Sequence, residues 1–173
     1  TEAIGIYANN NKTGGTIGDS DINLSSGTID VSNSVGGIGL FVNKGTVTDA
    51  GSTITVGQNG IGLYAKDSKI DLLNATINLN GDNALGIYLD GATSFNGTGT
   101  INISGQNITL FNMDTTATVT NNFIVGNVSA GSSYTLGNIK NGVFTYTGIT
   151  SLGSNGTLVS GKQSAVYLNN LAV

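Results

Sequence analysis

Ile61-Gly62-Leu63-Tyr64 is the clearest copy of a block that decides how this chain folds. Three equivalent blocks are Ile4-Gly5-Ile6-Tyr7, Ile38-Gly39-Leu40-Phe41 and Leu85-Gly86-Ile87-Tyr88. Weaker copies end at Phe111, Tyr134 and Tyr167, and most of the closing aromatic residues are 23 or 24 residues apart. A fixed period of this length is typical of a solenoid, in which each repeat packs only on its neighbours.

A second block, which precedes the aromatic one, alternates apolar and polar residues. Its copies are Thr28-Ile29-Asp30-Val31, Thr53-Ile54-Thr55-Val56, Thr76-Ile77-Asn78-Leu79 and Thr100-Ile101-Asn102-Ile103. Period two with β-branched residues predicts a strand with one buried face. We therefore expect an inward column made of Ile29, Ile54, Ile77 and Ile101, which continues at Ile124.

The aromatic block alternates as well, so Ile61, Leu63 and Ala65 are expected on one face and Gly62 and Tyr64 on the other. A third, fainter strand is expected about six residues after each aromatic residue. Its candidates are 22–24, Val47, 70–72 and Phe95. Corners are expected at 57–60 and 80–83, because Gly and Asn tolerate positive φ. The pattern predicts an all-β parallel β-helix of about six to seven coils, each with three short strands, and no helices.

Two of the gaps between aromatic residues are 34 and 33 residues long, which indicates two loop insertions in one β-helix segment spanning 1–173. The first insertion is expected near 9–18 and the second near 138–155. The second contains Val143-Phe144-Thr145-Tyr146-Thr147, a pattern that favours a small hairpin. Loops on a rigid scaffold often carry recognition, so both insertions are candidate binding segments. Because the chain opens and closes inside the repeat, we interpret it as a piece of a longer protein.

The composition argues against several classes of function. The chain has six Lys, no Arg, no His and no Cys, and its net charge is -4. This balance disfavours nucleic-acid binding, which needs basic patches. The chain contains no run of 18 apolar residues, so the sequence predicts no membrane-spanning helix. The nine Asp residues and one Glu form no column of stacked acids, so we predict no enzyme, no catalytic residues and no cofactor.

The metal and ice-binding motifs of other β-solenoids are also missing. The nonapeptide calcium repeat is absent, and Asp19-Ser20-Asp21 is interpreted as an ordinary turn, so no metal site is expected. The outward threonine column has only one paired motif, Thr53-Ile54-Thr55, and β-propensity explains it. The leucine-rich repeat has a similar period, but Leu does not dominate here.

The outward aromatic column is the main candidate binding surface. We expect Tyr7, Phe41, Tyr64, Tyr88 and Phe111 to run along one side of the rod, where aromatic rings can contact sugars, peptides or a partner. A structural interpretation competes with this one. In four copies a glycine lies two residues before the ring, which would let the ring cover bare backbone, and stacked ladders stabilise parallel sheets without any ligand.

The alternation of Gly-Ile-Gly-Leu-Tyr and Ala-Leu-Gly-Ile-Tyr with Gly-Thr-Ile-Asn-Ile and Ser-Thr-Ile-Thr-Val resembles the passenger repeats of type V autotransporters. The repeats are most similar to those of the large fusobacterial outer-membrane adhesins, over residues 1 to about 111. The resemblance implies a right-handed parallel β-helix at the surface of a Gram-negative cell, held by a C-terminal membrane barrel that this chain lacks. It also implies roles in cell adhesion and virulence, and it transfers no functional residue.

Two functions remain open at this point. The first is a structural and adhesive segment that attaches to an unknown host or bacterial surface protein or glycan. The alternative is a polysaccharide-active β-helix enzyme or a tailspike-like carbohydrate-binding module. A groove lined by acids or bases would separate the two, because only the enzyme requires it.

Overall fold

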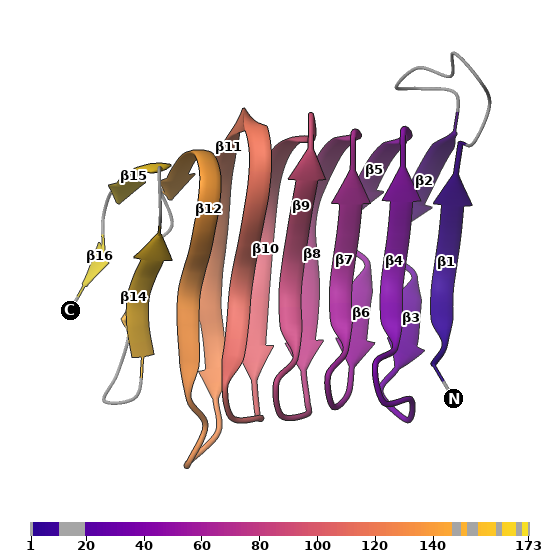
Figure 1. Ribbon diagram of the computed structural model, residues 1–173. Coiled ribbons are helices and arrows are strands. Elements are labelled where there is room, and N and C mark those ends of the chain that lie inside the picture. Colours follow the sequence, from indigo (N-terminus) through magenta and orange to yellow (C-terminus); the bar gives the residue numbers. More distant parts are fainter. Residues whose placement is uncertain are drawn as a thin grey trace.

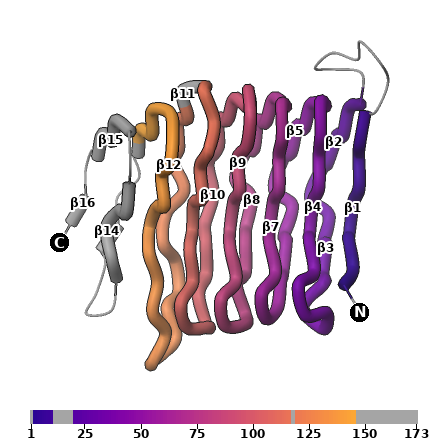
Figure 2. Tube along the Cα trace, in the orientation of Figure 1, coloured from indigo at the N-terminus to yellow at the C-terminus, as the bar shows by residue number. Residues whose placement is uncertain are grey.

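The computed structural model shows an all-β parallel solenoid (Figures 1 and 2). It describes residues 2–10, 20–146, 150–151, 156–161, 164–168 and 171–172, with only the backbone for 117, 118 and from 146 onward. These residues contain no helix, and therefore no apolar helix long enough to cross a membrane.

Five coils are described from their first strand to their last. The first two are β1 (Ile4–Asn9), β2 (Asp21–Ser25) and β3 (Thr28–Val31), followed by β4 (Ile38–Asn43), β5 (Thr46–Ala50) and β6 (Thr53–Val56). The next three are β7 (Ile61–Lys66) with β8 (Lys69–Leu79), β9 (Leu85–Gly91) with β10 (Ser94–Ile103), and β11 (Ile108–Val128). The later strands are β12 (Tyr134–Tyr146), β13 (Thr150–Ser151), β14 (Gly156–Gly161), β15 (Ser164–Leu168) and β16 (Leu171–Ala172).

Strands of successive coils pair in parallel and in register, which creates three faces. Face A contains β1, β4, β7, β9 and the first parts of β11 and β12, and Figure 1 shows its first four strands side by side. Face B contains β2, β5 and the first parts of β8 and β10. Face C contains β3, β6 and the second parts of β8 and β10. The expected three strands per coil are separate in the first two coils, and from β8 onward strands run across corners.

The expected inward isoleucine column is confirmed over four coils. Ile29, Ile54, Ile77 and Ile101 are direct partners in the sheet, and all four are buried. Full burial of each side chain stabilises the fold by about 1.5–3 kcal/mol. The continuation at Ile124 is wrong, because Val125 pairs with Ile101 and Ile124 is 43% exposed. The buried ring of Phe123 sets the alternation there, so its neighbour Ile124 points outward.

Residues with positive φ mark the same corner in successive coils. Asn59, Asn83 and Asn107 have φ of 56°, 57° and 55°, and each ends the passage from face C to face A. Asn is one of the few residues that adopt this conformation at low cost, as the sequence predicted for 57–60 and 80–83. The equivalent positions of another corner, between faces A and B, are Lys44, Asp67 and Gly91.

The predicted alternation of the aromatic block is wrong at its first two residues. In β7 the side chain of Ile61 is half-exposed, Gly62 and Leu63 are both buried, and Tyr64 is half-exposed. A Cβ atom on Gly62 would lie 3.0 Å from Ile77 Cγ2 and 2.6 Å from the Gly86 carbonyl oxygen. The glycine therefore faces the core, where it lets face A approach the isoleucine column of face C. It does not lie under the tyrosine ring.

The second predicted insertion is also wrong in its described part. Asn138–Tyr146 continues β12 and pairs in parallel with β11, for example Ile139 with Met113 and Phe144 with Val119. The stretch therefore forms no hairpin, and the buried Phe144 side chain fixes it in the core. The rest of this insertion, apart from the short strand β13, and residues 11–18 of the first insertion lie outside the described residues.

Candidate binding face

Face A presents two apolar columns to the outside over its first four coils. The aliphatic column contains Ile4, Ile38, Ile61 and Leu85, and the aromatic column contains Tyr7, Phe41, Tyr64 and Tyr88. We call these eight residues the apolar band. Tyr7 and Ile4 are exposed, and the other six are half-buried. The band arises because each block places its first and fourth residues outward and the two residues between them inward.

The first three rings of the aromatic column form an offset stack. The ring centroids of Tyr7 and Phe41 are 4.9 Å apart with planes 11° apart, and those of Phe41 and Tyr64 are 5.2 Å apart with planes 6° apart. This separation matches the spacing of neighbouring strands, about 4.8 Å. The stack breaks at Tyr88, whose plane is 89° from that of Tyr64. Tyr88 therefore ends the column with a different orientation.

The predicted fifth member of this column, Phe111, is not on the surface. Its side chain is buried, its strand partner is Ile87, and its ring lies 5.5 Å from that of Phe144. Asn112 takes the outward position beside Tyr88. The aromatic residue of the block that ends at Phe111 is thus shifted by one position. Leu110 and Phe111 fill the two inward places that Gly86 and Ile87 occupy one coil earlier. The large inward rings of this region form an internal cluster: Phe95, Phe111, Phe123 and Phe144.

The later weak copies leave the column too. Tyr134 is buried and pairs with Ile108. The backbone of Tyr167 pairs with Thr145, on the strand that follows face A in the coil, so it is not in register with Tyr134. The aromatic column therefore ends at Tyr88 within the described residues.

The outward surface of face A changes from apolar to polar after the fourth coil. Thr109 and Thr135 continue the aliphatic column, and Asn112 and Asn138 continue the aromatic one. All four side chains are half-buried. The Oδ1 atom of Asn112 is buried and has no hydrogen-bond partner among the described residues. The sequence showed this boundary only indirectly, since Thr109-Leu110-Phe111-Asn112 has to be aligned with Leu85-Gly86-Ile87-Tyr88.

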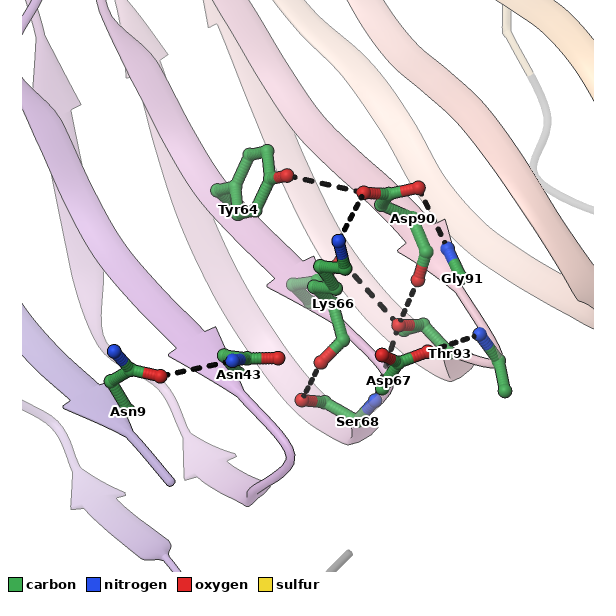
Figure 3. Close-up of polar contacts among 11 residues, drawn as sticks. Asn9, Asn43, Tyr64, Lys66, Asp67, Ser68, Asp90, Gly91 and Thr93 are labelled. Atoms are coloured by element: carbon green, nitrogen blue, oxygen red, sulfur yellow. Dashed lines mark hydrogen bonds and ion pairs between the residues drawn. The ribbon is translucent and has the colours of Figure 1, made fainter. Parts of the chain in front are cut away.

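A polar column borders the apolar band at the corner with face B (Figure 3). The hydroxyl of Tyr64 donates to Asp90 Oδ2 at 3.3 Å, and Lys66 Nζ lies 3.7 Å from the same oxygen. Two coils earlier, Asn43 Nδ2 donates to Asn9 Oδ1 at 2.9 Å. The pKa of Tyr64 is raised to about 12. Burial of the phenol is the largest cause, and the negative charge of Asp90 and the hydrogen bond to it act in the same direction.

Buried hydroxyl groups hold this corner in place. The Ser68 hydroxyl donates to the Lys66 carbonyl at 2.6 Å, and the Thr93 hydroxyl donates to the Asp90 carbonyl at 2.6 Å. Thr93 Oγ1 also accepts from the Ser68 backbone N–H at 3.2 Å. Both side chains are fully buried, so these bonds fix the backbone that carries Lys66 and Asp90.

Faces B and C differ from face A in their outward chemistry. On face C, Asn102 Nδ2 donates to Asn78 Oδ1 at 2.9 Å, and Asn78 Nδ2 donates to Thr55 Oγ1 at 3.1 Å. This amide ladder bonds its members to one another across successive coils. On face B, Lys69 pairs with Asp71 at 3.7 Å. Face A is therefore distinguished by its apolar band.

No group of three or more acidic residues that could hold a metal ion occurs within the described part of the chain. The fold and the apolar band define a parallel β-solenoid with one apolar outer face. Comparison with protein-family models, curated proteins and solved structures finds no match in any of the three.

Proposed function

We propose that this chain is a structural and adhesive segment of a surface-displayed β-solenoid, of the kind its repeats resemble in type V autotransporter passengers. In this proposal it lies outside a Gram-negative cell and supports attachment to a host or bacterial surface. The apolar band is the contact surface. The alternative of a polysaccharide-active enzyme is retained as an outcome of the tests below.

The apolar band carries the proposal. Over four consecutive coils, large apolar side chains occupy outward positions that are mostly polar on the neighbouring faces, and Tyr7 remains 57% exposed. An apolar patch bordered by polar residues is characteristic of an interaction surface. The rigid stack of coils holds the patch flat, so little conformational entropy is lost when it is covered.

Attachment of coated beads to cells tests the proposal. We compare the unchanged chain with a double variant, Phe41→Ser with Tyr64→Ser, that removes two central rings of the band. The matched control is the double variant Val35→Ser with Leu73→Ser, because Val35 and Leu73 are 54% and 56% exposed but lie outside the band. Circular dichroism and melting curves establish that each variant is folded.

We expect the band variant to lose most of the attachment and the control variant to retain it. Equal attachment by both folded variants would remove the apolar band from the proposal. Incubation with pectins, glucans and glycosaminoglycans, with and without Ca²⁺, is the second assay. Reproducible release of oligosaccharides would favour the enzyme instead.

A further inference from the structure

The end of the apolar band combines two kinds of chemistry in one place. Tyr88 supplies the last outward ring, and Asn112 and Asn138 follow it in the same column at steps of about 4.8 Å. Asp90 and Asp114 are direct partners in the neighbouring polar column, about 6.6 Å away along the strands. The Tyr88 ring thus has one carboxamide beside it, a second carboxamide one coil further on, and two carboxylates in the neighbouring column.

The size of the apolar band limits what binds there. Its four strands are separated by three spacings of about 4.8 Å, and the first and fourth residues of each block are three steps of about 3.3 Å apart. With side-chain widths added, the band measures roughly 20 Å by 15 Å, or about 300 Å². A stable protein interface buries about 800 Å² on each partner. The band is therefore too small to hold a second copy of the chain or another protein in a stable complex by itself. A narrow ligand that lies along the rod fits it better.

The polar groups indicate the chemistry of that ligand. Asn112 Oδ1 is buried without a hydrogen-bond partner among the described residues, so this carboxamide keeps an unused acceptor. Asp90 is already neutralised in part by Lys66 at 3.7 Å, whereas Asp114 adds a second carboxylate beside it. Carboxylates accept hydrogen bonds from hydroxyl groups and repel anions.

We propose that Tyr88, Asn112 and Asn138, with Asp114 beside them, form a subsite for a neutral pyranose of a surface glycan. The C–H face of the sugar packs on the Tyr88 ring, and its hydroxyl groups bond to the carboxamides and to Asp114. This inference rests on the proposed adhesive function and specifies its ligand. Acidic sugars are excluded by the two adjacent carboxylates.

An array of neutral and acidic oligosaccharides is the direct test, followed by ligand-observed NMR with the bound glycan. The test variants are Tyr88→Ala and Asn112→Ala, and the matched control is Leu73→Ala, which removes an exposed apolar side chain outside the apolar band. Asn112→Ala removes an acceptor that has no partner, so it leaves folding intact even if Tyr88→Ala does not.

We expect binding to a neutral glycan, a loss of about tenfold or more in affinity for each test variant, and unchanged affinity for Leu73→Ala. Absence of binding to every glycan at millimolar concentration would overturn the proposal, as would preference for acidic glycans or equal affinity in all folded variants. Bead attachment to cells treated with glycosidases separates the adhesive function of the apolar band from the glycan subsite at its end. Attachment that survives glycan removal but requires the apolar band supports adhesion and rejects the glycan subsite.

Discussion

Replacement of Gly39 by Ala is the sharpest test of how the coils pack. A Cβ atom at this position would collide with Ile54 Cγ2 and would lie 2.7 Å from the Gly62 carbonyl oxygen. The first contact is with a buried side chain of face C, and the second is with the backbone of the next coil. Neither atom is the end of a flexible side chain, so the sheet itself has to move.

The expected loss of stability follows from this overpacking. An extra methyl group in a packed core costs about 1–3 kcal/mol. For a chain of this size, that corresponds to a melting temperature about 2–12 °C lower. Gly27→Ala is the matched control, because a Cβ atom there would lie 3.9 Å from Ser52 Oγ, an ordinary van der Waals contact, and its φ is not positive. At such a position Ala stabilises by about 0.4–1 kcal/mol through the unfolded state.

Thermal and urea unfolding followed by circular dichroism measure both variants. The ring-covering explanation of the glycines is tested in the same experiment by adding Phe41→Ala to each chain. If Gly39 were needed so that the Phe41 ring could cover its backbone, removal of the ring would abolish the loss of stability caused by Gly39→Ala. Equal stability of the Gly39 and Gly27 variants would refute the close approach of face A to face C.

Two further predictions concern burial and pH. Ile77→Asp places an unpaired charge in the core and should cost about 3–5 kcal/mol, whereas Ile124→Asp, at an outward position, should change the melting temperature little. Retention of the native melting temperature by Ile77→Asp would contradict the inward column. The pKa of Tyr64 rises from 10.0 to about 12, so the neutral phenol stabilises the folded state below pH 10 and this contribution disappears as the pH rises through about 12. Absorbance titration of the chain against its Tyr64→Phe variant measures this pKa, and Asp90→Asn should lower it; ionisation of Tyr64 near pH 10 would contradict the network with Asp90.

Most of the fold was predictable because the strands obey strict alternation. The column of Ile29, Ile54, Ile77 and Ile101 could be read directly, since each isoleucine follows a threonine at the same phase of the repeat. The corners at Asn59 and Asn83 could be predicted for the same reason, because few residues tolerate their φ. Parallel stacking then follows from the period alone.

The orientation of Gly62 was not predictable from alternation. Two consecutive residues point inward in this block, and period two assigns one of them to the wrong face. The reason lies in tertiary packing, because Ile77 of the opposite face occupies the space that a side chain at Gly62 would need. A sequence pattern within one strand contains no information about that distance.

The candidate surface was predictable in four coils and failed in the fifth. Tyr7, Phe41, Tyr64 and Tyr88 follow the strong block, so their phase is unambiguous. Phe111 was assigned to the same column because it is aromatic and has the right spacing within one residue. Burial of its ring stabilises the chain more than exposure would, and Asn112 next to it is the better surface residue. A one-residue shift in strand phase exchanges the two faces.

The repeated geometry of the corner residues determines how the rod can be shortened or lengthened by whole coils. Asn59 and Asn83 have φ of 56° and 57° and are 24 residues apart, so a chain in which Gln58 joins Asn83 meets the same backbone geometry. Such an excision removes one complete coil and leaves every remaining strand opposite an equivalent partner. The rod shortens by one strand spacing, about 4.8 Å, while the chemistry of each side is kept. Gain or loss of whole coils thus moves the boundary between the aromatic column and the asparagines that follow it along the rod, by one strand spacing for each coil.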